Sequence, residues 1–254
     1  MASRTGSVSD DAASHGRITR ELLRLARDAS ADRVPLAGEM DLVDRLHCTR
    51  QQLRKAMADL ERQGLLRRRQ GAATVVDPLA LRMSVRLEDQ FEHTELLERL
   101  GYEARVEIVA ETWGSLPADV AALLDCDPGA PCVHTTKRWF ADDLPVMIAT
   151  GYLLVPDAEP TRLDDSVFTA VAQAWGESLV WEVATPGADV LDAESAALLD
   201  MSAGDPVMTL ELIGVAASGR RLFYASELHR PDIVRYSLVR TVRPPWQAGP
   251  SMTS

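Results

Sequence analysis

The feature that most constrains the fold of this 254-residue sequence is an internal repeat in its second half. The string AALLD occurs at 121–125 and again at 196–200, which is an offset of 75 in the numbering. Further matches occur at the same offset: Gly129 with Gly204, Pro131 with Pro206, and the Pro-Asp pair at 156–157 with that at 231–232. A duplicated segment forms the same local structure twice, so this half of the chain is expected to contain two related units.

Each copy has the pattern of a short helix, a Gly/Pro turn, a strand, a turn and a returning strand. The expected strands are 132–140 and 145–154 in the first copy, and 207–215 and 221–229 in the second. Segments 179–190 and 234–242 are expected to add strand, and 164–175 is expected to be a helix between the copies. Two related hairpins in one sheet, with helices on one side, form an α+β layer. A repeated half of this kind often builds a cleft between its copies.

Residues 1–76 have a different pattern, which predicts three helices followed by a hairpin. The helices are expected within 17–30, 38–46 and 49–63, and the two short strands within 65–69 and 73–76. Thr49 and Gln52 have the spacing of a capping box at the start of the third helix. Its apolar residues form one stripe, which we expect to be buried: Leu53, Ala56, Met57 and Leu60.

This order of elements is that of a winged helix-turn-helix, in which the start of the second helix of the motif meets base edges in the major groove. The residues expected there are Thr49, Arg50, Gln51 and Arg54, opposite the apolar stripe. Arginine can pair with guanine and glutamine with adenine. Arg67, Arg68 and Arg69 on the first strand of the hairpin, the wing, suit phosphate contacts. Gly71 at its tip would allow close approach of the backbone to the DNA. The alternative is a basic hairpin that is merely exposed.

The distribution of charge also favours a polyanionic partner for the N-terminal part. The whole chain has a formal net charge of -11, yet residues 17–76 hold 13 basic and 8 acidic side chains. Residues 77–254 hold 13 basic and 28 acidic side chains, a balance that repels nucleic acid. We therefore expect residues 16–77 to bind DNA and the acidic remainder to have another role.

Residues 36–76 resemble the GntR family of bacterial transcription regulators. The positions that fit the family pattern are Glu39, Leu42, Thr49, Arg50, Arg54, Ala56, Leu60, Gly64, Leu65, Leu66, Gly71 and Thr74. The resemblance implies that Thr49, Arg50, Arg54 and Gly71 touch DNA. The sequence departs from the pattern at three places: Leu-Ala-Gly replaces Leu-Pro-Ser, Met40 replaces a DNA-contacting arginine found in many members, and Ala73 replaces the second wing glycine. These departures concern operator preference rather than the fold.

Residues 84–242, which contain the repeat, are similar to the UTRA effector domain. This domain is the partner of GntR winged helices in the HutC-like subfamily. The resemblance implies an α+β fold shared with chorismate lyase, a cleft for a small effector and a homodimer. The expected organisation is a flexible leader (1–15), a winged helix-turn-helix DNA-binding domain (16–77), a linker (78–84), a UTRA-like effector-binding and dimerisation domain (85–243) and a flexible tail (244–254).

The resemblance also places candidate effector-binding residues: Thr94, Lys137, Trp139, Ala149, Phe223 and His229. Glu92 and His93 stand where hydroxyl residues would hold a phosphate, and a carboxylate there repels one. We therefore expect a more apolar ligand, with one anionic or acceptor group facing Lys137, instead of a phosphosugar. The alternative for Trp139 and Phe223 is a place in the hydrophobic core.

Other classes of function find no support in the sequence. No apolar run approaches the roughly 20 residues of a membrane-spanning helix, no secretory signal is present, and three cysteines suggest reduced thiols, so a cytoplasmic protein is expected. We expect no cofactor and no metal, because the five histidines lack ligand spacing and no catalytic or nucleotide-binding motif occurs. The expected function is a ligand-responsive transcription regulator, with repression expected rather than activation. It is expected to bind a near-palindromic operator in double-stranded DNA as a homodimer. The alternatives are a lyase-like enzyme with an appended helical domain, and a protein-interaction module.

Overall fold

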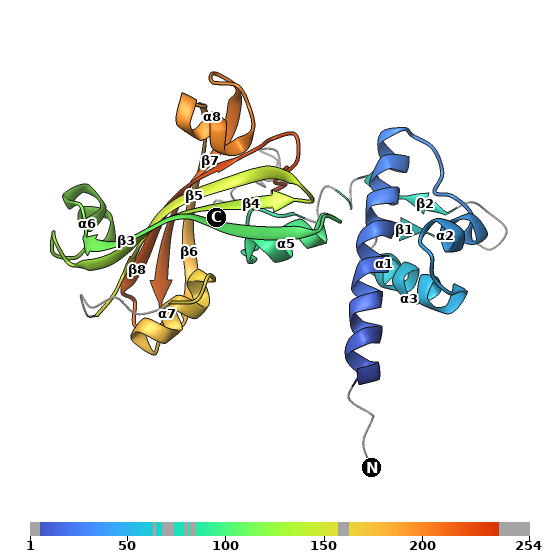
Figure 1. Cartoon of the computed structure of the whole chain (residues 1–254), viewed down its shortest axis with the longest axis horizontal. Helices are drawn as coiled ribbons and strands as arrows, with labels where there is room; N and C mark the ends of the chain where they lie inside the picture. Colours follow the sequence, from blue (N-terminus) through green and yellow to red (C-terminus); the bar gives the residue numbers. More distant parts are fainter. Residues whose placement is uncertain are drawn as a thin grey trace, which may run out of the picture.

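The structure is a computed structural model that describes residues 6–62, 65–67, 74–78, 81, 85–156 and 163–238. Its N-terminal unit consists of three helices and a short hairpin (Figure 1). The elements are α1 (Gly6–Ala31), α2 (Glu39–Arg45), α3 (Arg50–Arg62), β1 (Leu66–Arg67) and β2 (Val75–Val76). They occur in the predicted order of a winged helix-turn-helix.

A single apolar core holds these helices together. The inward face of α1, with Ile18, Leu22 and Ala26 at helical spacing, is fully buried against α3. On α3 the buried residues are the predicted stripe: Leu53, Ala56, Met57 and Leu60. The predicted capping box is confirmed, because the backbone N–H of Gln52 donates to Thr49 Oγ1 and that of Thr49 donates to Gln52 Oε1. Burying the stripe leaves the opposite face of α3 in solvent.

The boundaries of the N-terminal unit differ from the expected ones. The expected leader of residues 1–15 is helical from Gly6 onward, so α1 begins about three helical turns before residue 16. Contacts with α3 hold this extension, since His15 pairs with Asp59 at 2.7 Å and Gln52 donates to Ser14. At the other end, Leu81 packs into the core of this unit although it falls within the expected linker. The expected tail lies outside the described residues.

The second unit is built on one antiparallel sheet of six strands. Its elements are α5 (His93–Arg99), β3 (Ala104–Ser115), α6 (Ala118–Leu124), β4 (Pro131–Ala141), β5 (Leu144–Leu154), α7 (Val167–Trp175), β6 (Leu179–Val190), α8 (Ala193–Leu199), β7 (Pro206–Ala216) and β8 (Arg221–His229). The strand order is β3-β4-β5-β8-β7-β6. The observed α+β architecture confirms the predicted fold class.

The predicted repeat is visible in the bounds of these elements. The bounds of β3, α6 and β4 recur, at the offset found in the sequence, as those of β6, α8 and β7. The returning strands β5 and β8 pair with each other at the centre, so the two copies form the two halves of the sheet. The edges of the sheet are therefore the equivalent strands β3 and β6.

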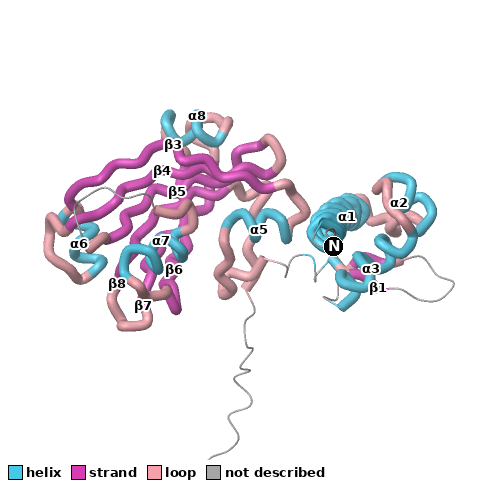
Figure 2. The backbone as a smooth tube through the Cα atoms, turned by 60° about the horizontal axis from the view of Figure 1, so that its bottom comes forward, coloured by secondary structure: helices cyan, strands magenta, loops and turns pink. Residues whose placement is uncertain are grey.

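Two expectations about this unit are wrong. Helices cover both faces of the sheet instead of one: α8 packs on the face that carries Ile148, whereas α5 and α7 lie across the other face (Figure 2). The segment expected as strand at 234–242 makes only an isolated bridge between Ser237 and Arg86, as far as it is described. Val234 and Tyr236 instead pack beside α5, where the segment covers the core and joins neither edge strand. Among the described residues, no helix combines the length and apolarity needed to cross a bilayer.

Candidate functional site

The start of α3 presents a group of exposed polar side chains. Thr49, Arg50, Gln51 and Arg54 are all exposed and lie on the face opposite the buried stripe, as the spacing predicted. Arg54 pairs with Glu39 at 3.0 Å, and a guanidinium nitrogen of Arg50 lies 2.7 Å from the sulfur of Met40. The first turn of α2 thus holds both arginines close to the helix start. Such a row has the shape and chemistry to enter a major groove.

The contacts of Glu39 and Met40 with the two arginines were not predicted from the sequence. Both residues precede the arginines by 10 to 15 positions, so their contact depends on how α2 packs on α3. The Glu39 carboxylate must release Arg54 before that side chain can reach a base or a phosphate.

The wing is described at its base. β1 and β2 pair antiparallel, with Leu66 opposite Val76 and Arg67 opposite Val75. Arg67 is exposed and pairs with Asp77 at 2.9 Å. Arg68, Arg69 and Gly71, which were predicted to contact DNA, lie outside the described residues. Of the three wing arginines, Arg67 is therefore the one whose position is described, and its side chain is exposed on β1, beside α3.

A cavity lies on the sheet face that α5 and α7 cover. Its floor consists of small side chains from the two central strands: Ala149 and Gly151 on β5 and Ala225 on β8. A side chain at Gly151 would be crowded, because a Cβ atom would lie 3.0 Å from the carbonyl oxygen of Tyr224 and 3.1 Å from the ring of Phe223. Small residues at the junction of the two repeats thus create the cleft that the duplication predicted.

Four of the six predicted effector residues line this cavity: Lys137, Trp139, Ala149 and Phe223. Lys137 and Glu227 are the neighbours of Ala149 on the two adjacent strands, so a cation and an anion flank the floor. His229 lies deeper and is fully buried, and Thr94 on α5 is not part of the lining. Trp139 and Phe223 each line the cavity and pack against the core, which unites the two interpretations of these rings.

The cavity is richer in acidic groups than the sequence pattern suggested. Its lining contains six carboxylic acids, namely Glu92, Glu111, Asp164, Asp165, Glu182 and Glu227. Lys137 donates to the backbone carbonyl of Asp165 at 2.6 Å. Burial lowers the pKa of Lys137, and Asp165, Glu92 and Glu111 oppose this effect. The expected anionic ligand group beside Lys137 would therefore also meet carboxylates that line the same cavity.

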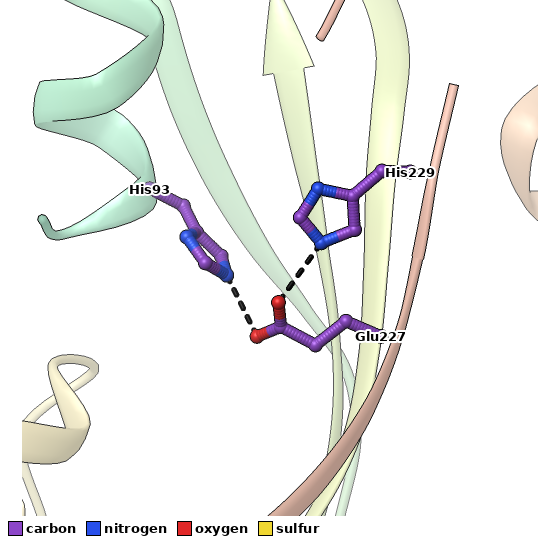
Figure 3. A group of neighbouring side chains, drawn as sticks. All are labelled: His93, Glu227 and His229. Carbon is purple, nitrogen blue, oxygen red and sulfur yellow. Dashed lines mark hydrogen bonds and ion pairs between the residues drawn. The ribbon is translucent and has the colours of Figure 1, made fainter. Parts of the chain in front are cut away.

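At the inner end of the cavity, three side chains form a buried cluster that we call the His93 cluster: His93, Glu227 and His229 (Figure 3). His93 Nε2 lies 2.7 Å from one oxygen of Glu227, and His229 Nε2 lies 2.9 Å from the other. His93 is the first residue of α5, whereas Glu227 and His229 are two residues apart on β8 and share one face. The carboxylate therefore bridges a helix and a strand that are distant in sequence.

The pKa shifts within this cluster have physical causes in burial and in the contacts among its members. Burial opposes ionisation of Glu227, but the contacts with His93 and His229 outweigh it and lower the pKa to about 2. For His93, burial lowers the pKa and the Glu227 carboxylate reverses this, so the net shift is upward. For His229, burial lowers the pKa and the Glu227 carboxylate opposes this effect, so the net shift is downward. Its Nε2 contacts Glu227, and its Nδ1 lies 3.1 Å from the Tyr236 hydroxyl oxygen.

A second carboxyl group, Glu182 on β6, faces the same cavity. Burial raises the pKa of Glu182 to about 7, and repulsion by Glu227 adds to the shift. Its Oε2 is buried and has no hydrogen-bond partner among the described residues. Glu182 thus offers a free acceptor to whatever enters the cavity.

The His93 cluster was not found from the sequence, because 134 positions separate His93 from Glu227. The available signal was the Glu227-x-His229 spacing on a strand, which puts both side chains on one face. Linear motifs for metal or catalytic sites rely on residues close in sequence, and this cluster forms only through the fold.

Comparison with known proteins identifies what this chain is similar to. The sequence pattern of the UTRA domain matches residues 99–235, which include β3 to β8 and the whole repeat. A similar curated protein, the HTH-type transcriptional regulator Rv0792c of Mycobacterium tuberculosis, is 29% identical over 80% of this chain and 76% of its own length. The HTH-type transcriptional repressor PhnF of Mycolicibacterium smegmatis is 25% identical over 81% of this chain and 84% of its own length.

Solved structures agree with this result at the level of the fold. The crystal structure of PhnF from Mycobacterium smegmatis superposes with a TM-score of 0.54 at 23% identity. The match covers 82% of this chain and 92% of that one, so it includes both the helical unit and the sheet unit.

Proposed function

This chain belongs to the UTRA domain family, since the match covers more than half of its residues, and we propose that it is a ligand-responsive transcription repressor. Its curated relatives are named as HTH-type regulators or repressors, not as enzymes. In this proposal the N-terminal unit binds double-stranded DNA, and the sheet unit binds a small effector that changes the affinity for DNA. The proposed boundary between the units follows Leu81, because that side chain packs with the N-terminal core.

The observation that carries the DNA-binding role is the capped start of α3. Its capping box satisfies the first backbone donors within the protein, and the row of Thr49, Arg50, Gln51 and Arg54 is exposed on one face. Arg50 and Gln51 would read base edges, since their side chains match guanine and adenine in the major groove. Arg54 and the wing arginines would bind phosphates and so fix the position of the helix.

The effector would occupy the cavity above Ala149, Gly151 and Ala225. Aromatic rings of Trp139 and Phe223 supply its apolar walls, and the carboxylates supply acceptors. This composition favours an effector that carries hydrogen-bond donors or positive charge in addition to an apolar part. A ligand shifts the DNA-binding equilibrium only by its different affinity for the two arrangements of the protein.

We further propose that the regulator acts as a homodimer on a near-palindromic site. A single helix-turn-helix contacts one half-site, and a two-fold dimer reads two half-sites with matching symmetry. The exposed apolar residues of the edge strand β6 support this assembly, with Trp181 66% exposed and Val183 54% exposed. An edge strand of this kind is a surface that a second copy can cover.

The experiment that tests the proposal is selection of DNA fragments from a random library by the full-length protein, followed by anisotropy titrations at several salt concentrations. We expect enrichment of a sequence with two-fold symmetry and affinity that falls steeply with salt. Arg62→Ala at the far end of α3, where Arg62 pairs with Asp59, serves as a control that keeps full affinity. A library from which the protein enriches no sequence, at low or high salt, would overturn the proposed function.

A further inference from the structure

We propose that the His93 cluster is a binding site for one divalent transition-metal ion of the zinc class, held by His93, Glu227 and His229. The three ligand atoms all lie within 4.8 Å of one another. Two imidazole nitrogens and one carboxylate oxygen form a common ligand set for catalytic and exchangeable zinc sites. The site is independent of the proposed function, because metal binding can be measured without DNA or effector.

The geometry requires only small movements of the three side chains. Tetrahedral zinc with bonds of about 2.0–2.1 Å needs ligand atoms roughly 3.3 Å apart. Glu227 now lies closer than this to both imidazoles, at 2.7 and 2.9 Å. An ion that replaced the two bridging hydrogens would move the carboxylate back by less than about an ångström. The three ligand atoms lie within 4.8 Å of one another, so the two imidazoles, one at the start of α5 and one on β8, must also move closer together to reach the tetrahedral separation.

The surroundings of His229 provide the support that metal-binding histidines usually have. Metal-bound histidines use a second polar group to hold the ring that binds the ion. Here the Tyr236 hydroxyl contacts His229 Nδ1, and a hydroxyl can accept as readily as it donates. It can therefore hold the tautomer in which Nδ1 carries the proton and Nε2 is free for the ion. His93 Nδ1 is buried without a hydrogen-bond partner in the described part of the chain, and that ring is held instead by its contacts with Glu227 and Trp139.

The charges around the cluster also favour a dication. Glu182 and Glu227 both line the cavity, and Glu182 Oε2 has no hydrogen-bond partner among the described residues. An ion with two positive charges compensates both carboxylates, and the cavity leaves one coordination position open to water or to a ligand group. A bound ion would join the start of α5 to β8, so it would stabilise the helix that closes one side of the cavity.

The test is a Co²⁺ titration of the full-length, untagged protein after treatment with a chelator. We expect one Co²⁺ per chain, with the visible absorption of a tetrahedral complex, and loss of that absorption when Zn²⁺ is added. His93→Gln should weaken Co²⁺ binding by roughly tenfold or more, since loss of even a supporting group costs 10–100-fold. His134→Gln is the matched control, because His134 stacks on Tyr152 outside the cluster and its loss should leave binding unchanged.

Binding that is absent, or equally strong in His93→Gln and wild type, would overturn the site. Since His229 is fully buried and its replacement could unfold the domain, X-ray absorption of the zinc-loaded wild type gives a second measurement. We expect scattering from two imidazoles, and a spectrum with oxygen ligands alone would also overturn the proposal. A metal-free protein that binds its selected DNA but never binds Co²⁺ would remove the metal site and leave the proposed function intact.

Discussion

At the scale of single residues, Arg50 is the side chain that should distinguish one DNA sequence from another. It is exposed at the first turn of α3, within reach of base edges when that helix enters a major groove. Arg50→Ala is expected to cost about 1–3 kcal/mol on the selected DNA site and much less on random DNA. Anisotropy titrations with both DNAs measure the difference, with Arg62→Ala as the control. Equal losses on the two DNAs would contradict base reading by Arg50.

Arg67 should behave differently, because it lies on the wing strand and is placed to meet phosphates. Its side chain is exposed and its partner Asp77 is on the neighbouring segment, so DNA must replace this ion pair. Arg67→Ala is expected to weaken binding to all sequences similarly and to reduce the salt slope by about one. The measurement is the dependence of log affinity on log salt for selected and random DNA. A loss confined to the selected sequence would count against a phosphate role.

The side-chain contact that the sequence predicted correctly is one between residues that are close together in the chain. Thr49 and Gln52 are three positions apart, so helix geometry alone brings them together. Lys137, Trp139 and Ala149 were proposed from the resemblance to the UTRA domain, and the observed register places Lys137 beside Ala149 on the neighbouring strand. His93 meets Glu227 only after α5 packs across the sheet, and no local periodicity reports such a contact.

At the scale of elements, the repeat made the second unit predictable. Two segments related by one constant offset in the numbering must form equivalent strands and helices, and the central pairing of β5 with β8 joins them. The placement of α5 and α7 on the opposite face from α8 was not predictable from the same pattern. These two helices are not part of the duplicated β-α-β-β segment, so the repeat carries no information about the face they cover.

The helix α5 is the element that touches both functional regions. At its start, Glu92 and His93 line the cavity, and Glu92 accepts a hydrogen bond from Ser166 at the start of α7. After its end, Gly101 lies against the backbone of α1, and the guanidinium of Arg27 on α1 lies over the ring of Tyr102. An effector or an ion that shifts α5 therefore has a direct contact through which to affect the DNA-binding unit.

Gly101 provides a test of this contact. Its φ is +87°, and an added Cβ atom would lie 3.0 Å from the carbonyl oxygen of Arg20 and 3.3 Å from the backbone nitrogen of Arg24. Gly129 has a similar φ of +82° with open space around it, so Gly129→Ala should cost only the backbone strain of about 1–2 kcal/mol. Gly101→Ala should cost more and should increase amide exchange in the part of α1 near Arg20 and Arg24. Urea unfolding and hydrogen exchange measure both effects, and equal costs for the two variants would show that the contact with α1 is unimportant.

At the scale of the whole molecule, the chain combines a basic N-terminal part with an acidic remainder. Residues 17–76 have five more basic than acidic side chains, and residues 77–254 have fifteen more acidic than basic ones. The acidic unit is therefore repelled by DNA, which favours an arrangement with the winged helices toward the duplex and the sheets away from it. A dimer formed through the sheet units satisfies this condition.

The edge strand β6 is the surface that we expect to form the dimer, and it leads to the last prediction. Val180, Trp181, Val183 and Val190 are each more than half exposed, whereas Ile108 and Val109 on the equivalent edge strand β3 are only 39% exposed. A charge placed at the centre of an apolar interface is left without a partner, so Trp181→Glu should give a monomer. Val109→Glu puts the same charge on the other edge and should remain a dimer, as measured by light scattering at micromolar concentration.

Because a monomer reads one half-site, the Trp181→Glu variant should also lose roughly tenfold or more in affinity for the selected DNA. A Trp181→Glu variant that remains dimeric would place the interface elsewhere, and a dimer broken by Val109→Glu would assign it to β3.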